Sequence, residues 1–135
     1  MKRLISTRYS AAAFNIALLV LRVGMGALMI PHGYNKLMNF MQYKKDFMNF
    51  MGIGSTTSLT LVIFAEFFCA ALIVLGLFTR FAAIPLVIGL SVALFVAHNG
   101  DAFGDGKVAA LFLTGFITIL LVGPGRISVD GMISK

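Results

Sequence analysis

The sequence predicts an all-α fold: an integral membrane four-helix bundle with an amphipathic interfacial or capping segment between its first and second helices. Hydrophobic residues make up 59% of the 135 residues, compared with roughly 45–50% in an ordinary soluble domain. The apolar residues form long runs that Gly, Pro and charged residues separate. Because a span needs about 20 apolar residues to cross roughly 30 Å of hydrocarbon, the chain has room for four spans. We therefore expect a single transmembrane domain over residues 1–135.

The first helix is predicted at residues 11–30. Three cations precede it, a pattern that resembles a secretory signal: Lys2, Arg3 and Arg8. No small-x-small cleavage site follows, and the apolar run is long enough to span a membrane. We therefore expect the run to be retained as a spanning helix, which Pro31 and Gly33 end.

The amphipathic segment is predicted at about residues 36–52. Its apolar side chains recur at helical spacing: Leu37, Phe40, Met41, Phe47, Met48 and Met51. A helix rich in Met and Phe can lie flat at the membrane interface, fold back as a cap over the bundle, or dock a partner protein. The pattern leaves these three roles open.

The remaining helices are predicted at residues 59–78, 81–97 and 108–122. Ser and Thr residues at positions 55–58 offer N-caps for the second helix. Thr79 and Arg80 form a tight turn before the third helix. Pro124, which lies between two glycines, stops the fourth helix.

The net charge of +6 is dispersed among helix ends and loops, which argues against nucleic-acid binding and favours contact with anionic lipid head groups. The end that holds both termini has six cations: Lys2, Arg3, Arg8, Arg80, Arg126 and Lys135. The other end has four cations and three acidic residues: Lys36, Lys44, Lys45, Lys107, Asp46, Asp101 and Asp105. This bias predicts that both termini are cytoplasmic in a bacterial inner membrane.

Two opposite charges interrupt the apolar runs, Arg22 in the first and Glu66 in the second. An ionisable group at the bilayer centre costs roughly 2.5–3.5 kcal/mol, so such groups face a bundle interior and find partners. If the first helix ends at Ile30 and the second begins at Leu59, both charges lie about 11–12 Å below the same face. We therefore predict an Arg22–Glu66 ion pair that either lines a ligand pocket or fixes the register of two helices.

More polar side chains gather at the outer end of the predicted bundle, and they make a polar mouth: His32, Lys36, His98 and Lys107. Thr114 and Thr118 follow on one face of the fourth helix, which predicts a polar face that runs inward from the mouth. The candidate ligand-binding residues are Arg22, His32, Lys36, Glu66 and His98.

Resident cofactors find little support in the sequence. A b-type haem between His32 and His98 is disfavoured because both residues adjoin helix-ending Pro or Gly rather than face each other across a pocket. No carboxylate or thiol falls at metal-ligand spacing with either histidine. Cys69 is the single cysteine and can form no internal disulfide or CxxC relay. Motifs of soluble hydrolases, nucleotide-binding proteins and zinc proteases are also absent.

Four motifs in order along the chain resemble the DoxX family of small bacterial membrane proteins. They are Arg22 within an apolar helix, His32-Gly33-Tyr34-Asn35-Lys36, Glu66 with Gly76-Leu77-Phe78-Thr79-Arg80, and Gly123-Pro124-Gly125-Arg126-Ile127-Ser128-Val129-Asp130. The resemblance implies a four-helix membrane protein whose better-understood relatives include the small membrane subunit of a thiosulfate:quinone oxidoreductase. The polar positions of the family map onto Arg22, His32, Lys36, Glu66 and Arg126.

The resemblance implies an accessory subunit of a quinone- or sulfur-linked redox complex rather than an enzyme alone. The chain would bind no covalent cofactor, and its partner would be an oxidoreductase subunit. In this hypothesis Arg22 stabilises a quinol anion, and Glu66 or His32 relays protons beside a bound quinone head group.

The alternative hypothesis is a non-catalytic membrane scaffold or assembly factor that docks partners through residues 37–51. A transporter or channel is disfavoured because a four-helix bundle is narrow and its two halves show no inverted repeat. Transport would require a homo-oligomer, a state that the sequence leaves open.

Overall fold

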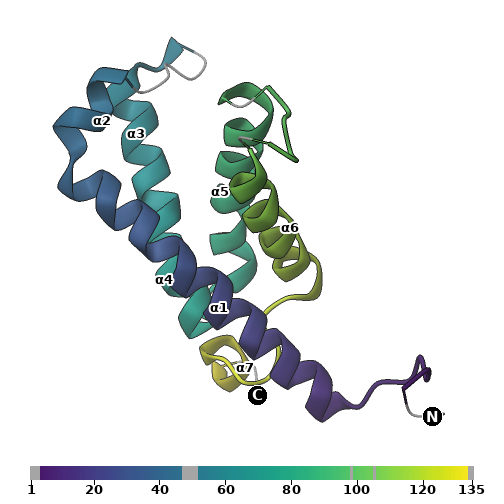
Figure 1. Cartoon of the computed structure of the whole chain (residues 1–135). Helices are drawn as coiled ribbons and strands as arrows, with labels where there is room; N and C mark the ends of the chain where they lie inside the picture. The colour runs from purple at the N-terminus through teal and green to yellow at the C-terminus, as the bar shows by residue number, and fades with distance from the viewer. Residues whose placement is uncertain (1–3, 47–51, 98, 105, 134–135) are drawn as a thin grey trace.

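The computed structural model describes residues 4–46, 52–97, 99–104 and 106–133. Within these residues, three helices are long and apolar enough to cross a membrane: Ala11–Met38, Ser55–Leu75 and Thr79–Val96. A shorter apolar helix follows at Lys107–Val122. The predicted all-α membrane fold is confirmed (Figure 1).

Helix α1 (Ala11–Met38) is longer than predicted. The side chain of Ser10 accepts a hydrogen bond from the backbone N–H of Ala13 and caps the helix. The prediction that Pro31 and Gly33 end this helix is wrong, because both lie inside it. A proline removes only one backbone donor, and membrane helices tolerate it where neighbouring helices hold the chain in place. The helix ends at Asn39, whose side-chain amide donates to the carbonyl of Asn35.

The predicted amphipathic segment is divided between two helices. Lys36 and its two successors belong to α1, and α2 (Phe40–Asp46) then packs against the second span. Residues 47–51, which include three of the apolar positions predicted to define this segment, lie outside the described residues. Figure 1 shows α2 beside α3 at one end of the molecule.

The second span consists of α3 (Ser55–Ile63), the π-helical turn η2 (Phe64–Cys69) and α4 (Ala70–Leu75). It begins and ends earlier than the predicted range 59–78. Ser58 donates to the carbonyl of Gly54 from within the helix instead of capping it. Gly76 ends the span because its φ of 73° places it in the left-handed region, where glycine carries no steric penalty.

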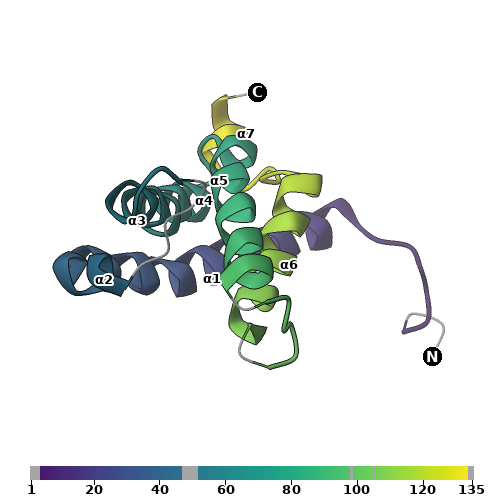
Figure 2. The ribbon, with the colours of Figure 1, turned by 90° about the horizontal axis from the view of Figure 1, so that it is seen from above.

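The last two apolar helices agree closely with the predicted ranges 81–97 and 108–122, except that Thr79 and Arg80, which the sequence predicts as a turn, are the first residues of the earlier helix. They are α5 (Thr79–Val92) continued by the π-helical turn η3 (Ala93–Ala97), and α6 (Lys107–Val122). A short helix, α7 (Val129–Ile133), closes the chain beneath them. Seen from above, α1 passes behind α5 and α6, which run across it, and extends alongside α3 and α4 (Figure 2).

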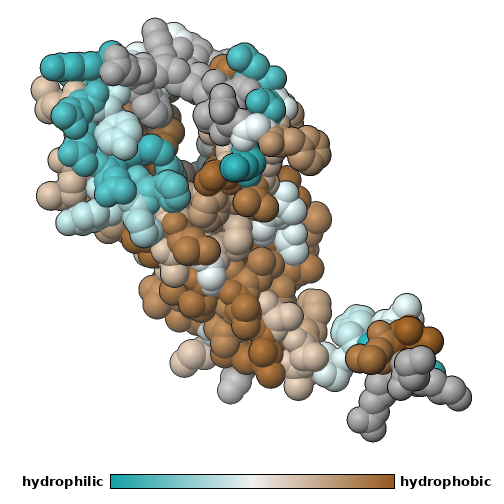
Figure 3. Space-filling model, viewed as in Figure 1, coloured by the Kyte–Doolittle hydropathy of each residue, from teal (hydrophilic) through white to brown (hydrophobic). Residues whose placement is uncertain are grey.

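The core lies where α1, α4, α5 and α6 meet, and its innermost side chains are almost fully buried: Met29, Ala70, Ile73, Ala83, Leu86, Phe116 and Ile119. Many large apolar side chains are exposed on the outside, as expected for a protein that faces lipid. Figure 3 shows this apolar surface over the lower part of the molecule and a hydrophilic surface around α2 and the end of α1. The apolar band and the polar end are thus separate.

Candidate functional site

Glu66 and Lys36 form an ion pair inside the bundle. The Nζ of Lys36 donates to both carboxylate oxygens of Glu66. Glu66 is only 8% exposed, whereas the Lys36 side chain is 23% exposed. Because the cationic partner is partly accessible, solvent or a ligand can reach this ion pair, which would not be possible if both side chains were fully enclosed.

Helix α1 approaches the backbone around Glu66 unusually closely. Glu66 lies in the π-helical turn η2, a local structure that occurs frequently at functional sites. Gly33 of α1 packs against this turn so tightly that an added Cβ would lie 2.7 Å from the backbone nitrogen of Phe67. Since Lys36 follows Gly33 by three residues, this close approach places its side chain over the Glu66 carboxylate.

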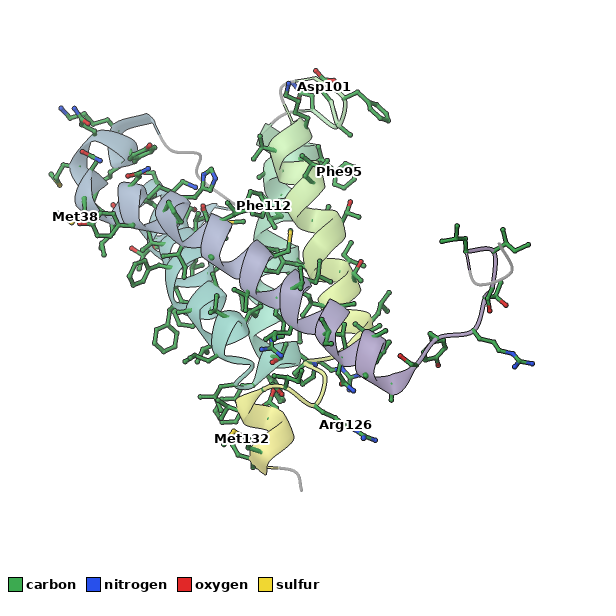
Figure 4. The ribbon with its side chains drawn as sticks, turned by 60° about the horizontal axis from the view of Figure 1, so that its bottom comes forward. Met38, Phe95, Asp101, Phe112, Arg126 and Met132 are labelled. Carbon is green, nitrogen blue, oxygen red and sulfur yellow. The ribbon has the colours of Figure 1, made fainter. Side chains whose placement is uncertain are left out.

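His32 lies four residues before Lys36, so the two share one face of α1. Its ring packs against that of Phe112 on α6 in a T-shaped arrangement, with ring centroids 5.6 Å apart and planes at 82°. Phe112 lies five residues from Lys107, the first residue of α6, and therefore about 7–8 Å from that end of the helix. Figure 4 shows Phe112 on the side of α6 that faces α1. We call Lys36, Glu66 and His32 the polar site.

Arg22 lies elsewhere, at the opposite end of the core, and is 2% exposed. Its Nε donates to the carbonyl of Ile73 at 3.1 Å, and its Nη2 lies 3.4 Å from the carbonyl of Val74. Its Nη1 donates to the carbonyls of Pro124 at 2.6 Å and Ile127 at 2.8 Å. These carbonyls lie in the last turn of α4 and just beyond the end of α6, where helix dipoles favour a cation.

The chain after α6 is fixed by further polar contacts. The Asp130 carboxylate accepts hydrogen bonds from the backbone N–H groups of Phe78 at 2.8 Å and Thr79 at 3.0 Å, and so caps α5. The backbone N–H of Arg126 donates to the side-chain oxygen of Asn15 on α1. We call Arg22 and residues 123–133 the C-terminal clamp.

Electrostatics also favour the ionised form of Asp130. Partial burial alone would raise the pKa of this carboxyl. The hydrogen bonds from Thr79 and Phe78, together with the nearby Arg22 guanidinium, outweigh burial and hold the pKa below its usual value. Asp130 therefore supplies a negative charge near a guanidinium whose hydrogen-bond partners are neutral carbonyls.

The DoxX family profile matches residues 17–99, which is more than half of the chain. The chain belongs to the DoxX family. It is also similar to the inner membrane protein YqjF of Escherichia coli (strain K12), with 28% identity over 127 residues that cover 90% of this chain and 95% of YqjF. No solved structure matches the chain. The predicted family resemblance is confirmed.

The C-terminal clamp brings together Arg22, the turn from Gly76 to Arg80 and the tail motif, whereas Glu66, the other part of the third motif, lies at the polar site. Arg22 binds the last turn of α4, Gly76 accepts at its carbonyl from the backbone N–H of Asp130, and the tail motif supplies Asp130 itself. The tail lies beyond the region that the family profile matches. Only the motif from His32 to Lys36, together with Glu66, builds the polar site of this DoxX protein.

The predicted Arg22–Glu66 ion pair is wrong. Glu66 pairs with Lys36, and Arg22 binds backbone carbonyls that lie seven and eight residues further along the second span. Seven residues of helix correspond to about 10 Å, so no common depth exists. The error follows from the first helix: since α1 continues past Ile30 to Met38, Lys36 rather than Arg22 is opposite Glu66.

The predicted polar face of the fourth helix is also wrong. Thr114 and Thr118 are exposed on the outside of α6, and their hydroxyls donate to carbonyls one turn earlier in the same helix. His98, the fifth candidate ligand-binding residue, lies outside the described residues, as do Lys2, Arg3, Lys135 and Asp105. Within the described part of the chain, no three His, Cys, Asp or Glu residues are grouped as a metal site.

Sequence reasoning missed Asp130 and Asn15 as residues that hold the tail. The signal for Asp130 was present, because it is the single acidic residue that the sequence shows after the Gly-Pro-Gly stop of the fourth helix. Its partner could not be found from spacing, because the N-terminus of α5 is more than fifty residues away in the sequence.

Proposed function

We propose that this DoxX protein is a multi-pass protein of the bacterial inner membrane that binds a quinone head group at the polar site. It serves as a subunit without a cofactor of its own in a quinone- or sulfur-linked redox complex, together with an oxidoreductase subunit. The observation that supports the proposal best is the ion pair between buried Glu66 and half-buried Lys36, just inside one end of the apolar band. The name of YqjF supports the location.

The chemistry of the polar site suits a quinone. Lys36 is a hydrogen-bond donor for a quinone carbonyl, and Glu66 can accept or return a proton. His32 adds an imidazole that can donate or accept a hydrogen bond, and the Phe112 ring beside it offers an aromatic surface for a planar head group. Arg22 takes no part, because carbonyls occupy its donors.

The orientation is part of the proposal. Arg8, Arg80 and Arg126 are exposed at the end of the molecule that carries α7. Cytoplasmic loops carry an excess of such cations, so we place both termini in the cytoplasm. The polar site then opens toward the periplasmic face.

Photolabelling tests the proposal directly. We would irradiate the purified protein in nanodiscs with an azidoquinone, with and without excess ubiquinone-1, and map the labelled peptides. We expect labelling of the peptides around His32, Glu66 or Phe112 that ubiquinone-1 suppresses. Glu66→Gln should weaken binding roughly tenfold, since a hydrogen bond to a charged group contributes about 1.5–3 kcal/mol.

Lys45→Gln is the matched control, because Lys45 is an exposed cation of α2 and should leave labelling unchanged. Labelling that is insensitive to ubiquinone-1, or equal in Glu66→Gln and the native chain, would contradict quinone binding at this site.

A scaffold function is the second candidate, and the surface of α2 favours it. Met38, Met41 and Tyr43 are exposed around the turn from α1 into α2. Purification in mild detergent separates the two functions. Specific recovery of oxidoreductase subunits supports the redox complex, whereas recovery of varied membrane proteins that Met41→Ser abolishes supports the scaffold.

A further inference from the structure

The polar site and the C-terminal clamp lie at opposite ends of one apolar core. We infer that the polar site exchanges water and ligand with one side of the membrane only, and that the C-terminal clamp seals the other side. The inference goes beyond the proposed function, because it holds for any ligand of the site.

The first barrier is the apolar core itself. Ile73 lies seven residues beyond Glu66, so about 10 Å of helix separates the polar site from the level of Arg22. The side chains packed over this interval are at most 2% exposed: Met29, Cys69, Ala70, Ile73, Leu86, Phe116 and Ile119. A close-packed apolar layer of this thickness excludes water.

The second barrier is the clamp. Arg22 ties the end of α4 to the carbonyls of Pro124 and Ile127, and Asp130 ties the tail to α5. Ser128 is 8% exposed and packs so close to Gly76 that a Cβ at position 76 would overlap its side chain. The tail is therefore part of the packed structure and closes the α7 end.

The polar groups that could have bridged the two ends point elsewhere. Thr114 and Thr118 face outward and satisfy their hydroxyls within α6. Arg22 is directed toward the tail and away from Glu66. Among the described residues, the buried polar and charged side chains lie at the two ends of the core: Ser58 and Glu66 at one, and Arg22, Thr79 and Ser128 at the other.

A one-sided site has a functional consequence. Ligand must leave by the end at which it enters, and any proton that Glu66 binds returns to the same side. This arrangement differs from alternating access, in which a central site opens to each side in turn. If the ligand is a quinone, its protons are taken up and released on one side of the membrane.

Thiol accessibility tests this inference without knowledge of the ligand. Cys69 is the single cysteine, so a Cys69→Ala background carries only the thiols that are introduced. We would introduce His32→Cys at the polar site, Lys107→Cys as a marker of that end, and Arg126→Cys as a marker of the α7 end. A membrane-impermeant thiosulfonate would be added to right-side-out and inside-out vesicles.

We expect His32→Cys to react from the same side as Lys107→Cys. From the Arg126→Cys side its reaction should be at least about 100-fold slower, since entry requires sub-global opening of the core. Addition of ubiquinone-1 should not change the side of the membrane from which His32→Cys reacts. Comparable reaction from both sides, or reaction from the Arg126→Cys side alone, overturns the inference, and so does reaction from neither side.

Ser128→Cys tests the seal separately, because the substitution is nearly isosteric and its position is buried. We expect this thiol to be unreactive from both sides and to become reactive when Asp130→Ala is added. Free reaction of Ser128→Cys without Asp130→Ala would show that the clamp is open and would overturn the inference. Failure of quinone photolabelling would leave these outcomes unaffected, so the two proposals fail independently.

Discussion

The C-terminal clamp and the polar site each hold a cation from the same face of α1, but they satisfy it in opposite ways. Arg22 is enclosed by backbone carbonyls that neither titrate nor move independently of their helices. Lys36 binds one carboxylate and keeps part of its side chain accessible. A planar guanidinium with five donors suits a fixed array of acceptors, whereas an ammonium on a flexible stem suits a site where partners change.

The comparison assigns different roles to two charges that look alike in the sequence. Loss of Arg22 removes the side-chain donor shared by the carbonyls of Ile73, Pro124 and Ile127 and releases three segments of chain from one another. Loss of Lys36 leaves one carboxylate that can protonate or bind solvent. We therefore expect stability to depend mainly on the clamp and binding to depend mainly on the polar site.

The largest expected effect is that of Arg22→Leu. Because hydrogen bonds to a charged group contribute about 1.5–3 kcal/mol each, loss of the guanidinium should cost roughly 3 kcal/mol or more. We expect little folded protein, measured as monodisperse yield in detergent and as the midpoint of thermal unfolding. Arg126→Leu is the control, since Arg126 is exposed at the same end. Equal stability of both variants would show that the clamp is not structural.

Gly76→Ala should have the next largest effect. Its φ of 73° penalises any Cβ, and the added atom would also overlap Ser128. Gly52→Ala is a matched control because Gly52 has a φ of 78° but no neighbour within 4 Å of the added Cβ. We expect Gly76→Ala to lower the free energy of unfolding by about 1–3 kcal/mol more than the control, the usual cost of overpacking. Equal effects would show that the tail does not pack tightly on this turn.

A double-mutant cycle between Lys36 and Glu66 should show a smaller coupling, of roughly 1–2 kcal/mol, because the lysine is partly exposed. The losses of unfolding free energy caused by Lys36→Met and by Glu66→Gln alone should add up to more than the loss caused by the double variant. The same cycle between Arg22 and Glu66 should give no coupling. Both cycles would be measured by unfolding in detergent. Coupling in the second cycle would contradict the structure and support the Arg22–Glu66 ion pair that the sequence predicts.

The smallest expected effect is the pH dependence that Asp130 confers. Its pKa is lowered in the folded protein, so its contribution is complete above the ordinary value of about 3.9 and is lost as the pH falls through the lower folded value. Asp130→Asn should therefore lower the thermal midpoint at pH 7, by the equivalent of about 1 kcal/mol for the one backbone hydrogen bond that an amide nitrogen cannot accept. The two midpoints should begin to converge as the pH falls below about 4 and should meet below the folded pKa. A constant difference down to pH 3 would contradict this role.

The helical membrane class and most helix ranges were predictable because long apolar runs leave few alternatives. Glu66 and Lys36 were both identified as candidate site residues, yet their pairing was not. The decisive residue was Pro31: proline usually ends a helix in water. Here α1 continues past it because Gly33 packs directly on η2 and neighbouring helices support the chain. Local sequence rules do not contain that support.

The sequence by itself determined the fold class, the family and which polar residues must be satisfied in a membrane, because each of these depends on composition and short motifs. Only the tertiary structure decided which polar groups satisfy one another. Register between α1 and the second span depends on glycine contacts and on a π-helical turn. If one of these helices is shifted by two turns along the other, every polar side chain between them has a different partner. For that reason one predicted pocket became a polar site at one end and a C-terminal clamp at the other.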